Sequence, residues 1–305
     1  MSAMYANEAT DTIVIKDEYG YVREVAYWVN SDNEAVIDGD IIYGPVDALM
    51  ANAYNGEFED EDQNFFERRA FSVFRGTETW PSGMVVYKYK DEDTEHLLQP
   101  FVTKAMETWT RNVPDVKFHR LQNSADRMDG VVTITANPCG GCNSHIGYDK
   151  KVPLHMNLQQ ACVGGTKRGT CHYAEALHEI GHLLGLKHEH QRPDREQTVH
   201  FLCENLNPMC SNMPQGGNCC GTSYPKGCCK QKADFTVAYD FNSAGPYDIT
   251  SVMQYRANAF ALPGKNTLVA VAPGAQVPTH SINKLSNGDI RRICQLYNDR
   301  GENCR

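Results

Sequence analysis

The chain has 305 residues, of which 41% are hydrophobic and 22% are charged. This composition suits one large globular domain with or without an appendage, and it excludes a chain that is disordered throughout. The formal net charge of -9 at pH 7 argues against a general nucleic-acid binder, which needs a basic face. No apolar run is long enough to cross a membrane, so we expect no transmembrane helix.

The start of the chain is far more acidic than the rest. Residues 1–69 hold 16 acidic and 4 basic side chains, a net charge of −12, whereas residues 70–305 carry a net charge of +3. The acidic part contains short apolar runs, one possible helix at 46–54, and an acidic run just before Arg68 and Arg69. This pattern predicts an exposed, protease-sensitive boundary. The alternative is a solvated linker with an incidental arginine pair.

Beyond this boundary, the spacing of hydrophobic residues predicts elements in chain order. Residues 203–232, dense in Cys, Gly, Pro and Asn, predict an irregular loop that needs cross-links to be ordered. Ser286 is expected to cap the last helix. The expected strands are 84–89, 116–121, 130–136 and 152–158, and the expected helices are 92–113, 173–186 and 286–297.

All 12 cysteines lie between Cys139 and Cys304, and they include two adjacent pairs. An even number at this density indicates a disulfide framework and an oxidising compartment. The alternative is a zinc-cysteine protein, which only the Cys139-x-x-Cys142 spacing could support. We therefore expect a secreted protein, although the first residues lack the features of a signal peptide, which we expect to have been trimmed or replaced.

The stretch HEIGHLLGLKH, which begins at His178, has the spacing of a catalytic zinc site. On a helix, His178 and His182 share one face and can bind one metal ion together. Gly185 permits a turn after the helix that would bring His188 to the same metal as third ligand. Glu179 could then take a proton from water at the open fourth position.

The extended pattern HExxHxxGxxH is typical of the metzincin metalloproteases, and the residues that follow it resemble the signature of the astacin family. Glu189 follows the third histidine, as it does in astacins. Leu186 and Glu196 depart from the family signature, where Phe and Asp are usual, but neither change removes a metal ligand.

A second stretch, SVMQY at residues 251–255, resembles the astacin Met-turn SxMHY, with Gln254 in place of His. The resemblance implies that Met253 lies beneath the zinc histidines. It also implies that Tyr255 is a fifth zinc ligand that swings away to stabilise the transition state.

The resemblance covers residues 70–305, apart from an unusual Cys-rich insertion near 204–232. It implies an α+β, two-lobed metzincin protease fold, with a twisted mixed sheet and two long helices above the zinc and an irregular, disulfide-rich lower lobe. It also implies a disulfide between Cys142 and Cys162. We expect residues 152–158 to be the upper edge strand that pairs with an extended substrate.

The acidic segment 1–69 resembles an astacin propeptide. Residues 37–41, IDGDI, are similar to the family motif FxGD, which places an Asp on the zinc. The resemblance implies that Asp40 ligates the zinc of the latent form and that cleavage between Arg69 and Ala70 activates the enzyme. The new N-terminus would then reach Glu189. Without the resemblance, the motif indicates only a surface turn.

Together these patterns predict a secreted, zinc-dependent endopeptidase in proenzyme form, with one Zn²⁺ per chain. Glu179 and Tyr255 would be its catalytic residues, and proteins or peptides its substrates. An activating protease is an expected partner, whereas nucleic acid and membrane are not, and we expect a monomer. The alternatives are a catalytically dead binding module and a Cys-rich interaction protein with a structural zinc.

Overall fold

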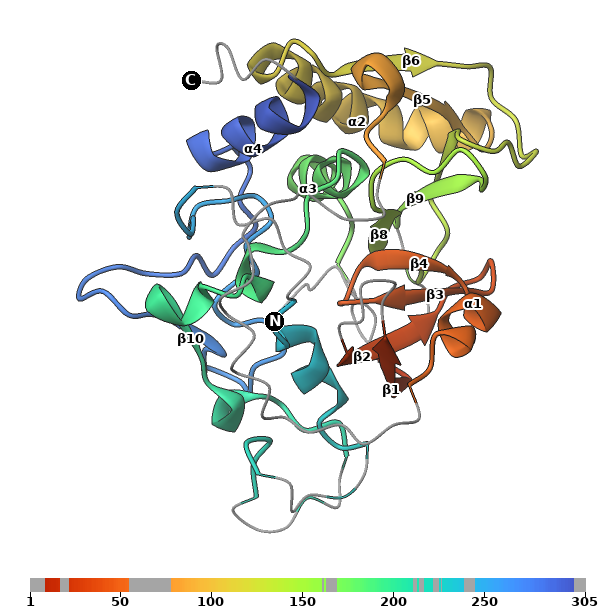
Figure 1. The fold of residues 1–305 in the computed structure, drawn as a ribbon. Helices are drawn as coiled ribbons and strands as arrows, with labels where there is room; N and C mark the ends of the chain where they lie inside the picture. Colours follow the sequence, from red (N-terminus) through yellow and green to blue (C-terminus); the bar gives the residue numbers. More distant parts are fainter. Residues whose placement is uncertain are drawn as a thin grey trace.

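The structure is a computed structural model of the chain. It describes residues 9–16, 22–54, 78–160, 162, 169–210, 213, 217–221, 225, 227–238 and 245–298. The predicted cleavage point at Arg69 and Ala70 and part of the Cys-rich insertion lie outside the described residues. Helices α2, α3 and α4 gather at one end of the molecule, and the part with little regular structure lies at the other (Figure 1).

A nine-stranded mixed sheet runs through the molecule in the order β1-β2-β3-β4-β8-β9-β7-β5-β6. Its first four strands form an antiparallel meander from the acidic start of the chain. We call the described residues of 9–54 the N-terminal segment. Its elements are β1 (Asp11–Lys16), β2 (Val22–Val29), β3 (Glu34–Ile37), β4 (Ile41–Pro45) and α1 (Val46–Ala51).

The other five strands follow the boundary in sequence. Strands β6, β5, β7 and β9 run parallel to one another, and β8 is antiparallel to β9. This arrangement confirms the predicted twisted mixed sheet. The strands are β5 (Met84–Tyr89), β6 (Lys117–Arg120), β7 (Val132–Thr135), β8 (Cys142–His145) and β9 (Leu154–Leu158).

The prediction that residues 152–158 form an edge strand is wrong. These residues form β9, which is hydrogen-bonded on both sides, to β7 and to β8. The strand at the border is β8, whose other side pairs in parallel with β4 of the N-terminal segment. Its sequence, CNSH, has no apolar alternation that could reveal a strand.

Two long helices lie over the sheet, as predicted: α2 (Glu92–Asn112) and α3 (Tyr173–Leu183). Asp91 caps α2, since its side chain accepts a hydrogen bond from the backbone N–H of Thr94. The indole of Trp109 on α2 donates to the carbonyl of Leu177 on α3 at 3.0 Å. One core cluster joins both helices to β5, β7 and β9. None of the described helices is long and apolar enough to span a membrane.

The lower lobe is the part of the chain between α3 and α4 (Asn287–Tyr297). It has a second core cluster, which includes Phe235 and Tyr255. Ser286 caps α4 as predicted, because its side chain accepts a hydrogen bond from the N–H of Asp289. The short elements of this lobe are β10 (Val199–Phe201), β11 (Leu268–Ala270) and the 3-10 helices η3 (Glu189–Gln191), η4 (Arg195–Gln197), η5 (Cys203–Asn205) and η6 (Lys230–Phe235).

The predicted disulfide between Cys142 and Cys162 is wrong. Cys142 instead bonds Cys171, and Cys162 bonds Cys139. The reason is the direction of the Cys142 side chain: it begins β8 and points into the core shared with the helices, where Cys171 precedes α3. Three further disulfides staple the Cys-rich insertion: Cys203–Cys220, Cys210–Cys228 and Cys219–Cys229.

Candidate metal centre

Helix α3 and the turn after it bring three histidines to one point. His178 and His182 lie one helical turn apart on the same buried face. The helix ends at Leu183, and Gly185 has a φ of 107°, a left-handed conformation that favours glycine. The chain therefore turns back, and the ring of His188 lies 4.8 Å from that of His182, between centroids.

Asp40 of the N-terminal segment completes the group. Its Oδ1 lies 2.9 Å from His188 Nε2 and 3.4 Å from His182 Nε2, and its Oδ2 lies 3.5 Å from His178 Nε2. The Nε2 atoms of His188 and His178 are 3.3 Å apart. Four ligands about 2.0–2.1 Å from one ion in a tetrahedral arrangement are separated by about 3.3 Å, so this spacing fits a zinc ion.

The hydrogen bonds around the group show which atoms face the centre. The Nδ1 atoms of His178 and His182 donate to the carbonyls of Val252 and Leu186, both at 2.7 Å. Their Nε2 atoms are then unprotonated acceptors in the neutral rings. Neither oxygen of the buried Asp40 carboxylate has a hydrogen-bond donor among the described residues. Buried acceptors that point at one another need a cation between them, so the donor set fits a metal.

A tight hairpin turn places Asp40. Asp38 and Gly39 belong to the three-residue turn 38–40 between β3 and β4 and have φ values of 52° and 91°, in the left-handed region that tight turns use. The indole of Trp28 donates to the carbonyl of Gly39 at 3.2 Å, and the N–H of Ser144 on β8 donates to the carbonyl of Asp40 at 3.0 Å. The turn is thus fixed both within the N-terminal segment and against the sheet.

The electrostatics around the centre favour an ionised carboxylate at Asp40 and a neutral ring at His182, whereas, against the effect of burial, the Asp40 carboxylate raises the pKa of His178. Burial would raise the pKa of Asp40, but the imidazoles of His188, His178 and His182 hold it well below its usual range. The pKa of His182 falls to about 4, mainly because burial disfavours its charged form. A neutral imidazole and an ionised carboxylate are the states in which these side chains bind metal.

Glu179, next to His178 on α3, is completely buried, and neither carboxylate oxygen has a hydrogen-bond partner among the described residues. Its pKa is raised well above the usual range by burial and by the nearby carboxylates of Asp40 and Glu175. A carboxylate with a raised pKa is suited to accept and return a proton near neutral pH.

Tyr255 lies beside the histidines but is held by the N-terminal segment. Its hydroxyl donates a 2.7 Å hydrogen bond to the backbone carbonyl of Asp38. Its ring stacks on His190, with 3.9 Å between centroids, and lies 4.6 Å from the ring of His188. The sequence did not reveal that Asp38 would hold this hydroxyl, because the contact joins two distant parts of the chain.

Met253 packs against α3 at Gly181. A Cβ atom added to Gly181 would come within 2.5 Å of its Sδ. The Met-turn is fixed from the C-terminal helix: Asp289 accepts hydrogen bonds from the Ser251 hydroxyl at 2.5 Å and from the Val252 N–H at 3.0 Å. Asp289 thus links the cap of α4 to the Met-turn, a role that sequence analysis missed.

Glu189 is buried in a polar cluster behind the site. Its carboxylate lies 2.7 Å from Nη1 of Arg292 and accepts a hydrogen bond from the N–H of Asp248 at 2.7 Å. Burial raises its pKa to about 7, although Arg292 and Arg192 act in the opposite direction. The predicted partner of Glu189, a new N-terminus near Ala70, lies outside the described residues.

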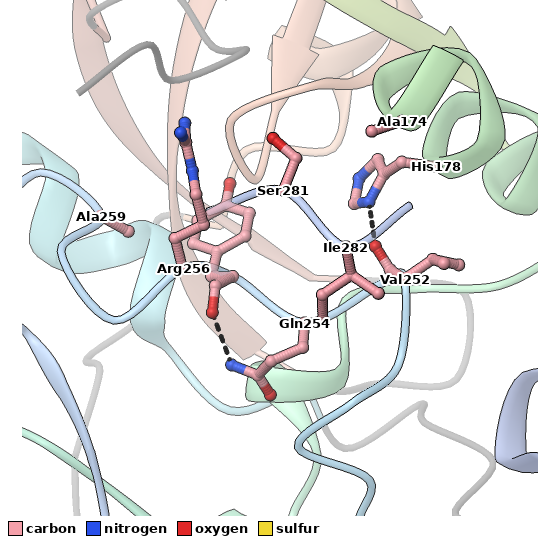
Figure 2. Close-up of a pocket in the computed structure, with 9 residues that line it drawn as sticks. Ala174, His178, Val252, Gln254, Arg256, Ala259, Ser281 and Ile282 are labelled. Atoms are coloured by element: carbon pink, nitrogen blue, oxygen red, sulfur yellow. Dashed lines mark hydrogen bonds between the residues drawn. The ribbon is translucent and has the colours of Figure 1, made fainter. Parts of the chain in front are cut away.

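A small pocket opens beside His178 and is shown in Figure 2. Gln254 lines this pocket, and its amide donates to the carbonyl of Tyr255 at 2.9 Å. The same amide accepts a hydrogen bond from the hydroxyl of Tyr247 at 2.5 Å. The replacement of the usual His by Gln254 is therefore accommodated without an unpaired polar group on this side chain. The pocket is also lined by Arg256 and Ser281.

Comparisons with known proteins agree with this geometry. The model of the astacin peptidase family matches residues 72–215 and 228–298. The chain is 28% identical over 244 residues to Astacin-like metalloprotease toxin 1 of Loxosceles intermedia, which covers 78% of this chain and 77% of that protein. It is 25% identical over 241 residues to zinc metalloproteinase nas-5 of Caenorhabditis elegans, which covers 76% of this chain and 59% of that protein.

Among solved structures, high choriolytic enzyme 1, a hatching enzyme zinc-protease from Oryzias latipes, shares the fold with a TM-score of 0.53 and 23% identity, over 75% of this chain and 96% of that one. The chain spans about three fifths of the length of nas-5. The family match covers most of residues 72–298 and includes the three histidines and the Met-turn. The chain belongs to the astacin family of peptidases.

Proposed function

We propose that the protein is a secreted zinc-dependent endopeptidase that residues 1–69 keep latent. The convergence of three histidine Nε2 atoms and the Asp40 carboxylate on one point carries this proposal. His178, His182 and His188 would hold the ion in both forms, and Asp40 would hold it only in the latent form. An ion bound there would polarise the scissile carbonyl and lower the pKa of a water molecule.

Glu179 would move the proton during hydrolysis. Its carboxylate takes a proton from the attacking water and returns it to the leaving amine. Asp40 raises the pKa of Glu179 in the latent form, so departure of the N-terminal segment removes a negative neighbour and makes the carboxylate a readier proton acceptor at neutral pH.

Tyr255 would stabilise the oxyanion once it is free. In the latent form its hydroxyl is occupied by the carbonyl of Asp38. Removal of that carbonyl leaves a buried hydroxyl beside His188 without its acceptor, and such a donor can be offered to a developing negative charge. The same movement would therefore vacate the fourth metal position and release a catalytic donor.

The N-terminal segment also occupies the strand edge that an extended substrate needs. Strand β4 pairs with β8 through Ile41 opposite Ser144 and Ile42 opposite His145. When β4 leaves, the backbone N–H and C=O groups of β8 become available for strand addition by a peptide. We place substrate pairing on β8, in contrast to the expectation for residues 152–158.

The activating step would be cleavage between Arg69 and Ala70. We propose that the new ammonium group then joins the Glu189 cluster, because a buried charge requires a partner. Glu189 already binds Arg292 and the N–H of Asp248, so the new terminus would add to this cluster. Mass analysis of the active form should find its N-terminus at residue 70 or 71.

The test of the function uses the full chain, loaded with zinc and then cleaved after Arg69. We expect hydrolysis of casein that a chelator abolishes and that Glu179→Gln lowers by about 10³-fold, with one zinc per chain retained. Glu107→Gln, an exposed change of the same type on α2, should leave the rate unchanged. A cleaved, zinc-loaded protein that hydrolyses no protein substrate would identify a binding module instead.

A further inference from the structure

The short helix η6 (Lys230–Phe235) contacts both His190, which lies beside the metal centre, and the N-terminal segment. On one side, Nε2 of His190 is 3.0 Å from the carbonyl of Asp234, and Arg195 donates to the carbonyl of Phe235 at 2.6 Å. On the other side, Ala233 packs against Ala9 and Ala26 of the N-terminal segment. The N-terminal segment therefore covers this helix, and we call η6 the floor.

The side chain of Asp234 is the unusual feature of this floor. It is 2% exposed, and its Oδ1 has no hydrogen-bond partner among the described residues. Its pKa is raised well above the usual range by burial and by the carboxylates of Asp38 and Asp40, with Arg23 opposing. A buried carboxyl oxygen without a partner is costly, and nothing within the described part of the lower lobe explains why an acid stands there.

The N-terminal segment places a positively charged side chain near Asp234. Arg23 of β2 forms a two-pronged ion pair with Asp38, with both N–O distances at 2.7 Å. The amide of Gln191 lies 3.4 Å from the carbonyl of Asp234 and also binds the Asp38 carboxylate. A guanidinium is thus present in the neighbourhood of both acids in the latent form.

Departure of the segment would remove the charged groups that act on Asp234 in the latent form. Asp38, Asp40 and Arg23 all leave together with the alanines that cover Ala233. Asp234 remains on the floor next to Phe235, whose ring lies 6.1 Å from that of Tyr255. Two disulfides end immediately before this helix, at Cys228 and Cys229, so the floor is held in place.

We infer that Asp234 binds a cationic side chain of the substrate in the opened cleft, so that the enzyme favours peptides with Arg or Lys at one position near the scissile bond. This inference rests on the proposed function, because it requires that the N-terminal segment leaves the cleft. The carboxylate would be partly buried and close to the reacting centre, where charge pairing discriminates strongly between substrates.

The test compares peptides that carry a single arginine, moved through the positions around the scissile bond, with peptides that carry citrulline instead. Citrulline has the shape of arginine without its charge. For the cleaved, zinc-loaded chain we expect a ratio of kcat/KM, arginine over citrulline, of at least tenfold at one position. Asp234→Asn should bring that ratio to about one, and Asp234→Lys should bring it below one. Glu204→Gln, which removes an exposed charge from the same disulfide-rich region, should preserve the ratio.

A second measurement separates this inference from the proposed function. Calorimetry on the cleaved chain with Glu179→Gln should show at least tenfold tighter binding of the arginine peptide than of its citrulline counterpart, lost on adding Asp234→Asn. If the chain hydrolyses peptides without any preference for arginine, the proposed role of Asp234 is wrong but the peptidase function is supported. The same conclusion follows if Asp234→Asn leaves an arginine preference intact. Absence of hydrolysis overturns the peptidase, and the binding ratio then decides the role of Asp234 by itself.

Discussion

The N-terminal segment and the rest of the molecule share a sheet but not the large hydrophobic core. The large core cluster of the helices and of β5, β7 and β9 contains no described residue of the N-terminal segment. The segment has a small cluster of its own, which includes Val25, Ile37 and Leu49. Apart from the small cluster of Ala9, Ala26 and Ala233 and the contact of Ile146 with the segment, each part buries its own hydrophobic residues, which fits the proposal that the segment can leave without unfolding the rest.

The junction between the two parts is mostly polar. It contains the pairing of β4 with β8, the contacts of Asp40 with the histidines and the hydrogen bond from Tyr255 to Asp38. Glu34 also lies 3.0 Å from Nδ1 of the buried His155. Polar groups that pair across an interface can be solvated again after separation, whereas an apolar interface would remain as an exposed patch. These features support the proposed role of the segment as a removable cover of the metal centre.

The largest expected effect comes from breaking the contact of the segment with the centre. In a full chain that cannot be cleaved, because Arg68 and Arg69 are replaced by Ala, Asp40→Ala should raise hydrolysis of a short peptide at least a hundredfold, or give an unstable precursor. The reason is that the fourth metal position is no longer filled by the carboxylate. The rate of peptide hydrolysis measures the effect.

Asp47→Ala, an exposed acidic residue on α1 of the same segment, is the matched control and should remain latent. The role of Asp40 would be refuted if the Asp40→Ala precursor were as latent as the control. In that case the spectrum of the cobalt-substituted protein would also be unchanged by the substitution.

The next largest effect is expected on the stability of the turn that carries Asp40. The pKa of Asp38 is lowered to about 2: burial would raise it, but Arg23 and a hydrogen bond from Gln191 outweigh burial. A carboxylate with a lowered folded-state pKa stabilises the fold above its unfolded pKa, and this contribution is lost as pH falls through the folded value. Asp38→Asn should cost about 2 kcal/mol of unfolding free energy at pH 5 to 7.

The difference between Asp38→Asn and the unmodified chain should shrink from pH 4 downward and disappear only below about pH 2, in urea titrations of the uncleaved protein. Asp32→Asn removes an exposed acid of the same segment, whose contact with Arg127 is on the surface, and should cost less than about 1 kcal/mol. If the loss of unfolding free energy in Asp38→Asn did not depend on pH, the shape of the Asp38 side chain, and not its charge, would stabilise the turn.

Within the catalytic part, the contact between α3 and the Met-turn can be tested at Gly181. Alanine gains about 1 kcal/mol of helix propensity, but its Cβ would meet Met253 Sδ at 2.5 Å, and overpacking costs about 1–3 kcal/mol. We expect Gly181→Ala to lower the unfolding free energy by about 1 kcal/mol and to weaken zinc binding. Adding Met253→Ala should relieve the overlap, so the double mutant should be more stable than the sum of the two single changes predicts. Additive changes in unfolding free energy would contradict the overlap.

The smallest effect is expected far from the junction, at the start of α4. Ser286→Ala removes the side chain that accepts from the Asp289 N–H at 2.9 Å and should cost about 1 kcal/mol in thermal or urea unfolding. Ser286→Thr keeps the hydroxyl and should cost less. Because Asp289 also fixes the Met-turn, a loss of zinc affinity with Ser286→Ala would show that the cap is coupled to the centre.

The sequence determined the parts of the site that depend on local geometry. The spacing of His178, His182 and Glu179 needs only a helix, and Gly185 needs only its own freedom at positive φ to return His188. The bounds of α2 and α4 were predicted within a residue or so, since apolar periodicity and capping residues act over a few positions.

Only the tertiary structure decided which distant groups meet. Cys142 bonds Cys171 because of the direction in which its side chain leaves β8, and β8 is a strand only because β9 and β4 pair with it. In the same way, Asp38 holds Tyr255 and Asp234 lies under the N-terminal segment through packing between remote elements. A residue's own sequence neighbourhood holds no record of such contacts, because they arise from the way whole elements fit together.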